Sequence, residues 1–434
     1  MIILFAGAVA AQAASGDLVW ARAYKAGNNL SERVAAAGVD SSSAVYATGW
    51  SGSNFATVKH DSNGTRKWGR SYNGPGNGSD KARALVVQGQ NIYVTGSSQG
   101  SSGGLDFATI KYRRNGARAW IKRYDGTAHG QDIARAVTAD AGGNAYVTGS
   151  SRGASTGLDY TTIKYGPSGK KLWTKRYDSG SGGKDIAYAV SLDSSGNVIV
   201  TGRSQNTTTG ADYATIMYSS SGTQQWVSRY NGPGNGVDQA KAVSADSSGN
   251  VYVTGSSAGA GSGADYATIQ YSTTGTQQWV SRYNGPGNGV DQAVGLSLDS
   301  STHVDVTGSS RGAASNFDYA TIQYSSTGTA QWVSRYDGSD SDADKAAGIS
   351  VDSSDSVFVT GSSKGSNGYG SVFSYATVKY DSAGVEQWAR TFGSILASSD
   401  YRGTAVAVDA NGAYAAGNVS DNLNSDMGII KYER

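Results

Sequence analysis

The chain has 434 residues, and its 36 Lys and Arg nearly balance its 34 Asp and Glu, leaving a net charge of +2. A balance this even favours neither nucleic acid nor an anionic membrane as a partner. The chain has no cysteine, which excludes disulfides, thiolate catalysis and thiolate metal sites.

The N-terminal segment, residues 1–15, is apolar and then rich in small residues. It resembles a secretion signal with a cleavage site at Ala11–Ala13, although it lacks a basic first part and is too short to span a bilayer. Two interpretations stand: a truncated or mis-started secretion signal, or a segment that is kept and docks onto a neighbouring molecule. We expect a secreted or cell-surface protein without a membrane span.

The first predicted strand, Leu18–Tyr24, carries the first of eight tryptophans that recur about every 53 residues. The other seven are Trp68, Trp120, Trp173, Trp226, Trp279, Trp332 and Trp388. The surrounding text also recurs, and GTQQWVSRYNGPGNGVDQA stands at both Gly222–Ala240 and Gly275–Ala293. Length alone suggests two or three domains, but a period of roughly 50 residues indicates an array of one supersecondary unit.

One unit consists of four short β-type segments separated by Gly, Asn, Asp and Ser turns. In the unit that ends at Tyr283 the strands are predicted at Ala240–Asp246, Val251–Ser257, Asp265–Tyr271 and Gln277–Tyr283. No stretch shows the apolar period of a helix. Four strands per unit are typical of a β-propeller blade, which buries its faces by packing against the neighbouring blades.

The chain contains eight second strands and eight third strands, and it ends after the third strand of the last unit. We therefore predict an all-β fold: a single eight-bladed propeller over residues 16–434, built from four-stranded antiparallel blades. Leu18–Tyr24 is expected to complete the last blade beside Met427–Tyr432, with Trp20, Tyr24, Ile430 and Tyr432 at the closure. Because the tryptophans keep a constant phase, we expect them to be core residues rather than ligand-stacking residues.

The repeat A-x-A-V-x-x-D-x-x-G-N-x-Y-V-T-G, followed by A-T-I-K-Y and W-x-x-R-Y strands, resembles the bacterial β-propeller repeat called SBBP. The resemblance covers roughly Val19 to Arg434. It implies a propeller in a secreted or surface protein, and the family name implies seven blades where eight are counted here.

The candidate binding face carries the connections between fourth and first strands and between second and third strands, which are the long ones. Trp50, the one tryptophan outside the series, is placed in such a loop of the first blade. The residues expected on this face are Trp50, Asn231, Asn235, Asp238, Asn284, Asn288, Asp291 and Tyr369.

An acidic residue precedes the first strand in seven of the eight units, at Glu32, Asp80, Asp132, Asp185, Asp238, Asp291 and Asp344. A catalytic or metal role does not need seven copies, so we interpret these carboxylates as acceptors for backbone N–H groups. The arginine three residues after the tryptophan is expected to pair with them across blades; the arginines are Arg123, Arg176, Arg229, Arg282 and Arg335. Alternate carboxylates at Asp340, Asp342 and Asp344 offer the one weak candidate for Ca²⁺, and no other cofactor is indicated.

Catalysis finds little support, because the histidines, His60, His129 and His303, stand in no nucleophile motif. Glycosylation triplets occur at Asn29, Asn63, Asn77, Asn206 and Asn418.

Two classes of function remain open. The first is a non-catalytic extracellular structural protein that assembles with copies of itself into filaments or a surface layer through its N-terminal segment or closing strand. The second is a monomeric secreted module that binds a glycan or a surface protein with its long-loop face. A polysaccharide-active enzyme is a distant third.

Overall fold

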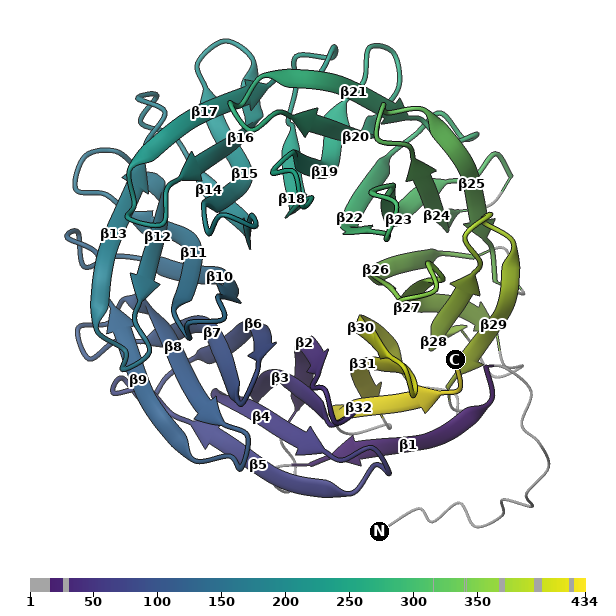
Figure 1. Ribbon diagram of the computed structural model, residues 1–434, viewed down its shortest axis with the longest axis horizontal. Helices are drawn as coiled ribbons and strands as arrows, with labels where there is room; N and C mark the ends of the chain where they lie inside the picture. Colours follow the sequence, from purple (N-terminus) through teal and green to yellow (C-terminus); the bar gives the residue numbers. More distant parts are fainter. Residues whose placement is uncertain are drawn as a thin grey trace.

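The computed structural model describes residues 16–25, 31–314, 316–338, 340, 342–366, 371–393, 400–420 and 425–434. Its regular elements are all strands, and they form eight four-stranded antiparallel sheets arranged as the blades of a ring (Figure 1). The predicted eight-bladed all-β propeller is confirmed. Within the described part of the chain, no helix is long and apolar enough to cross a membrane.

The first seven blades each follow the chain from the innermost to the outermost strand. Blades 1 to 4 consist of β2 (Glu32–Val39), β3 (Val45–Ser51), β4 (Asn54–His60), β5 (Arg66–Tyr72); β6 (Asp80–Gln88), β7 (Asn91–Gln99), β8 (Leu105–Arg113), β9 (Arg118–Tyr124); β10 (Asp132–Ala139), β11 (Ala145–Arg152), β12 (Leu158–Tyr165), β13 (Lys171–Tyr177); and β14 (Ile186–Leu192), β15 (Val198–Asn206), β16 (Gly210–Tyr218), β17 (Gln224–Tyr230). Blades 5 to 7 consist of β18 (Gln239–Ala245), β19 (Val251–Ala258), β20 (Ala264–Tyr271), β21 (Gln277–Tyr283); β22 (Asp291–Leu298), β23 (Val304–Arg311), β24 (Phe317–Tyr324), β25 (Ala330–Tyr336); and β26 (Asp344–Val351), β27 (Val357–Ser366), β28 (Ser371–Tyr380), β29 (Glu386–Phe392).

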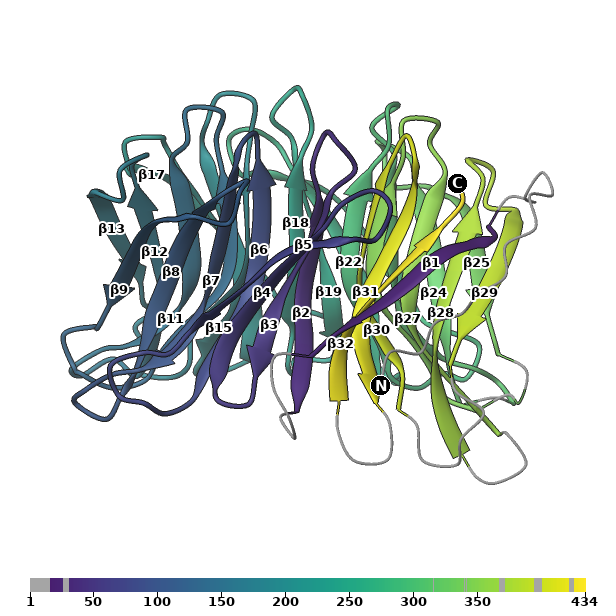
Figure 2. The same cartoon turned by 90° about the horizontal axis from the view of Figure 1, so that it is seen from below.

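The eighth blade closes the ring as predicted. It combines β30 (Arg402–Asp409), β31 (Gly412–Ser420) and β32 (Ser425–Tyr432) with β1 (Leu18–Tyr24), which pairs antiparallel with β32. Both views show β1 alongside β32 at the outer rim (Figures 1 and 2). In the register, Ala21 faces Ile430 and Tyr24 faces Met427. The two ends of the chain are thus joined in one sheet, which leaves the eighth blade no open outer edge on β32.

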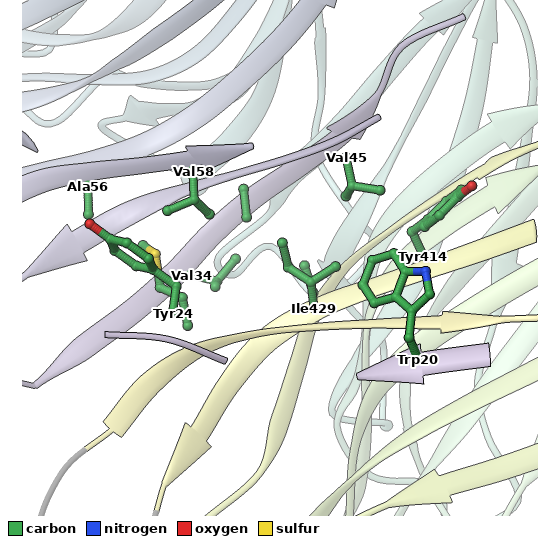
Figure 3. Close-up of a cluster of buried hydrophobic side chains, with 11 residues drawn as sticks. Trp20, Tyr24, Val34, Val45, Ala56, Val58, Tyr414 and Ile429 are labelled. Carbon is green, nitrogen blue, oxygen red and sulfur yellow. The ribbon is translucent and has the colours of Figure 1, made fainter. Parts of the chain in front are cut away.

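The closure is also a hydrophobic seam between the eighth and first blades. Trp20 and Tyr24 from β1 are buried, and they share a cluster with Ile429 and Tyr414 of their own blade. Val34, Val45 and Val58 of the first blade complete the cluster, and Figure 3 shows these side chains converging from the two blades. Each blade therefore buries one of its faces against its neighbour rather than within itself.

The repeated tryptophans lie in these junctions between blades, as expected for core residues. The Trp226 indole packs 6.0 Å from the Tyr271 ring of the next blade, and its Nε1 donates a hydrogen bond to Thr273 O at 3.0 Å. Gly275, in the same turn, lies against the indole, which leaves no room for a side chain there. His60 is likewise buried near Trp20, and burial lowers its pKa to about 4.

The sixth blade departs from the repeat at Asp305, a fully buried carboxyl on β23 where most second strands carry Tyr or Phe. Its Oδ1 accepts a hydrogen bond from Gln323 Nε2 at 3.1 Å, and burial raises its pKa to about 8. The folded protein therefore holds this proton up to pH about 8, whereas the unfolded chain loses it near pH about 4.

Stability is accordingly expected to fall as the pH rises between these two values. Asp305→Asn removes the ionisable group and should raise the free energy of unfolding at pH 7 on the order of 2–4 kcal/mol, with little change at pH 4. Urea unfolding of both proteins across this pH range measures the difference. Parallel pH profiles for the two proteins would contradict the assignment.

Candidate functional site

The innermost strand of every blade carries a β-bulge at the same position. The register of β10 and β11 shifts between Ala134 and Ala136, so that Arg135 is the extra residue, and the same shift recurs in all eight blades. A bulge re-aims the side chain of its extra residue. Because these eight strands surround the axis of the ring (Figure 1), the bulges give the ring one special position per blade on its inner side.

The bulge explains the glycine of the repeated V-T-G text. Gly255 on β19 lies against the bulged strand, and a Cβ there would collide with the carbonyl oxygen of Gln239 and lie 2.8 Å from the Cα of Ala240. The equivalent glycine of each other blade faces the same backbone, as Gly96 and Gly149 do. This glycine is required by close approach rather than by a positive φ.

The residues at the bulges differ from blade to blade, unlike their surroundings. In ring order they are Ala35, Arg83, Arg135, Tyr188, Lys241, Val294, Ala347 and Thr404. The bulge position thus carries a polar or charged side chain in four consecutive blades. In the other four blades it carries alanine, valine or threonine. A further cation, Arg203 on β15, stands where five of the other second strands have serine. We call Arg83, Arg135, Arg203 and Lys241, together with Tyr188, the inner basic arc.

These side chains converge although they come from different blades. The Arg135 guanidinium lies 5.3 Å from the centre of the Tyr188 ring, and Lys241 Nζ lies 4.2 Å from it. Tyr188 therefore bridges two cations that belong to blades on either side of its own. Cation–π contacts of this kind favour a cation by about 0.5–2 kcal/mol.

The four cations lack anionic partners in the described part of the chain. The Nε atoms of Arg83, Arg135 and Arg203 are buried and have no hydrogen-bond partner there. Burial lowers the pKa of Arg83. Burial is also the main cause that lowers the pKa of Arg135; Tyr188 opposes it, and repulsion from Arg83 and Arg203 adds to it. Burial, and then Arg135 and Arg203, lowers the pKa of Lys241 to about 8. The arc is a site of concentrated, partly desolvated positive charge.

Comparison with known proteins agrees with the fold. Residues 225–261 match the family model for the SBBP β-propeller repeat, and they span the last strand of one blade and the first half of the next. The chain is an eight-bladed β-propeller that contains a match to this repeat. No curated protein sequence matches the chain.

Solved structures similar to this propeller are distant in sequence. They include a periplasmic gluconolactonase of Pseudomonas aeruginosa, at 11% identity over 72% of this chain and 87% of that one with a TM-score of 0.46. An ulvan lyase matches at 11% identity over 79% and 90% with a TM-score of 0.44. The β-propeller domain of the Trilobed protease from Pyrococcus furiosus matches at 6% over 81% and 96% with a TM-score of 0.45. Enzymes therefore occur among the similar structures, but at these identities the likeness concerns the ring alone.

The acidic residues before the first strands hold the loops of the propeller, as their repetition predicts. Asp238 is fully buried; its Oδ2 accepts from Gly232 N at 2.7 Å and its Oδ1 from Ala258 N at 2.8 Å. Asp291 does the same for Gly285 N and Arg311 N. Asp238 and Asp291, two members of the predicted binding face, thus have a structural role, because each carboxylate holds two loop segments together.

The predicted partner of the repeated arginine was wrong. Arg229 pairs with Asp212 of its own blade, at 3.0 Å, rather than with Asp238, because Asp212 lies on the paired strand β16, two residues before the Ala214 that faces Arg229. The contact of Arg229 across blades is instead with the hydroxyl of Tyr177, at 3.1 Å. The arginine thus ties two blades together through a neutral group.

The asparagines of the predicted binding face also form local loop contacts. Asn231 donates to Asn235, and Asn284 donates to Asn288, in both cases at 2.6 Å. Asn235 and Asn288 have φ values of 47° and 46°, a conformation that asparagine tolerates better than most residues. Tyr369 lies outside the described residues.

The predicted position of Trp50 in a long loop was wrong. It lies within β3, whose hairpin to β4 has only two residues between the strands, so the first blade has no long loop there. Its ring is half-buried under Lys81 of the next blade, whose Nζ lies 5.4 Å from the ring centre.

The three carboxylates of the Ca²⁺ candidate do not converge on one another. Asp342 pairs with Lys364 Nζ at 2.5 Å, whereas Asp344 is buried and accepts from Gly338 N at 2.6 Å. The carboxylate oxygens near Asp344 belong to Asp318 and Asp337, and Arg335 already pairs with Asp318 at 2.6 Å. Calcium binding by Asp340, Asp342 and Asp344 stays a prediction.

The glycosylation candidates differ in accessibility. Asn63 and Asn77 are exposed and Asn206 is half-buried, while Asn29 lies outside the described residues. Asn418 is buried, and its Oδ1 accepts from Val34 N of the first blade at 2.9 Å. A glycan on the Asn418 Nδ2 is incompatible with the burial of this side chain in the folded ring.

Sequence reasoning missed the inner basic arc. The sequence shows these positions only by differences between the repeat units. The residues that differ are the middle residue of the A-x-A motif and the residue after V-T-G, which is serine in most units. Four adjacent units carry Arg, Arg, Tyr and Lys at the first position, and one of them also carries Arg203 at the second.

Proposed function

We propose that this protein is a secreted ligand-binding module whose ligand is an anion held by the inner basic arc. The observation that carries the proposal is the convergence of Arg83, Arg135, Arg203 and Lys241 without a carboxylate to balance them in the described chain. Partly desolvated like charges destabilise a fold unless a counter-charge is bound. A bound anion supplies that charge, and location outside the cell rests on the resemblance of residues 1–15 to a secretion signal.

The repeat itself indicates that the fold does not need these cations. Ala35 and Ala347 occupy the same bulge as Arg135, and serine occupies the position of Arg203 in five blades. A cation that destabilises its surroundings, at a position where the same unit accepts alanine or serine, is better explained by binding than by folding.

The double variant Arg135→Ala, Arg203→Ser therefore separates the two roles. It should keep or raise the free energy of unfolding of the ligand-free protein, by up to about 2 kcal/mol, because it relieves repulsion with residues that the repeat already uses. It should also weaken the binding of inorganic phosphate, used as a probe anion, by at least about tenfold. Calorimetric titration and urea unfolding measure the two effects.

Lys170→Gln is the matched control, because Lys170 is exposed in a turn of the third blade. It removes a positive charge from the outside of the ring and should change neither quantity. A double variant that loses stability but keeps phosphate affinity would show the arginines to be structural and would contradict the proposal.

The other two readings from the sequence stay predictions. Self-assembly through residues 1–15 depends on a segment outside the described residues, and it can coexist with an anion site on the inner side. Binding of a glycan or surface protein by the long-loop face is compatible with the same ring. A catalytic role would need a nucleophile or general acid beside the arc, and Tyr188 with its two cations is the group to test first.

A further inference from the structure

Resting on the proposed function, we infer that the group bound by the inner basic arc is a tetrahedral oxyanion, a phosphate or sulfate monoester, rather than a carboxylate. The number and kind of unpaired donors on the arc indicate this group. It concerns the chemical class of the ligand, which the presence of positive charge alone does not decide.

The three arginines leave unpaired the part of the guanidinium that recognises oxyanions. The Nε–H of an arginine and the adjacent Nη–H form a planar edge that binds two oxygens side by side. In Arg83, Arg135 and Arg203 the Nε is buried and lacks a partner among the described residues. The edge-forming donor is therefore unused in all three side chains among the described residues, whereas Arg123 on the outer strand β9 donates from Nε and Nη2 to Asp106 Oδ2.

A carboxylate cannot satisfy three such edges. It offers two oxygens in one plane, enough for one or two bidentate arginines. A phosphate or sulfate monoester offers three terminal oxygens that point in different directions out of a plane. Because Arg83, Arg135 and Arg203 come from β6, β10 and β15 of three consecutive blades, they approach the site from different directions. That arrangement fits the tetrahedral group.

Lys241 and Tyr188 complete the site from its other end. Lys241 is a point charge without the fork of arginine, so it adds attraction with little demand on the shape of the anion. With Arg135 and Lys241 both near its ring, Tyr188 holds their heads apart and limits the space between them. Tyr188 is thus a positioning residue for the two cations.

The test compares three glucose derivatives whose anionic group stands at the C6 end of the same ring: glucose 6-phosphate, glucose 6-sulfate and glucuronate, in which C6 is the carboxylate carbon. Calorimetric titration of the full chain at low salt should show the sulfate, which carries the same single charge as the carboxylate, binding at least about tenfold tighter than the carboxylate. The order of phosphate and sulfate identifies which monoester the site prefers. Arg135→Lys, which keeps the charge and removes the fork, should remove most of this preference and leave a weaker, salt-sensitive attraction to all three.

Each outcome bears on a different step. Equal affinity for all three sugars, or unchanged selectivity in Arg135→Lys, would overturn the tetrahedral assignment while leaving anion binding intact. Absence of binding by any of the three sugars and by inorganic phosphate would overturn the proposed function as well. Circular dichroism and unfolding of Arg135→Lys establish that the variant is folded, and Tyr188→Phe, which keeps the ring, should retain the selectivity.

Discussion

Deletion of residues 1–24 is expected to lower the free energy of unfolding by more than about 5 kcal/mol, or to prevent the ring from closing at all. The deletion removes β1, exposes the edge of β32 and takes two buried aromatic side chains, Trp20 and Tyr24, out of the seam between the last and first blades. Loss of one such aromatic alone destabilises a core by about 3–5 kcal/mol. Deletion of residues 1–15 keeps β1 and is the matched control, expected to leave the unfolding transition in place.

A point substitution tests the same seam without removing a strand. Trp20→Ala should lose about 3–5 kcal/mol, because the indole packs 6.3 Å from the Tyr414 ring and donates to Ser62 O of the first blade. Val19→Ala, one residue earlier, alters a side chain that is 47% exposed and should stay within about 0.5 kcal/mol of the parent. Equal denaturation midpoints for the two variants would show that β1 does not bury the seam.

The second large effect is expected from Gly255→Ala. The added Cβ would collide with the Gln239 carbonyl oxygen and lie 2.8 Å from Ala240 Cα, both on the bulged strand β18. Neither contact can be relieved by a flexible side chain, so the bulge itself must move, and we expect a loss of about 3 kcal/mol or more. Since the bulge also presents Lys241, anion binding should weaken as well.

Gly166→Ala provides the comparison for this glycine. A Cβ on Gly166 would meet its nearest neighbours, atoms of Leu172 and Lys170, only at 3.6 Å or beyond, which is ordinary contact. Its unfolding free energy should stay within about 0.5 kcal/mol of the parent. A Gly255→Ala protein as stable as Gly166→Ala would show that the bulge adapts and that close approach does not explain the repeated glycine.

The strands and their closure could be predicted because they follow from local periodicity. Trp20 has the same position in its strand as the other seven tryptophans have in theirs, and the last unit lacks a fourth strand. These two observations are enough to assign β1 to the last blade. The loop-holding role of Asp238 could be predicted in the same way, because a single binding or catalytic site would not require the same acidic residue in seven blades. The partner of Arg229 could not be predicted in this manner, because the sequence does not show that Asp212, on the strand paired with that of Arg229, lies nearer than Asp238 at the start of the next blade.

The candidate site was hidden for a physical reason. A bulge is defined by how two strands pair. The sequence alone therefore does not show that the middle residue of A-x-A is the extra, bulged residue; the register of β10 with β11 is needed to identify it. The proximity of Arg135 and Lys241, more than 100 residues apart in sequence, exists only because their blades lie two places apart around a closed ring. Departures from a repeat, rather than the repeat, mark the positions where such a ring is specialised.

The central claim is that one anion binds on the inner side of the ring, and the stoichiometry of phosphate binding tests it most directly. Calorimetric titration of the parent protein at low salt should give one site per chain, because the arc occurs once although the bulge occurs in all eight blades. The Arg135→Ala, Arg203→Ser variant should lose that site. Several weak sites of equal affinity that persist in the variant, or no binding in the parent, would contradict the claim.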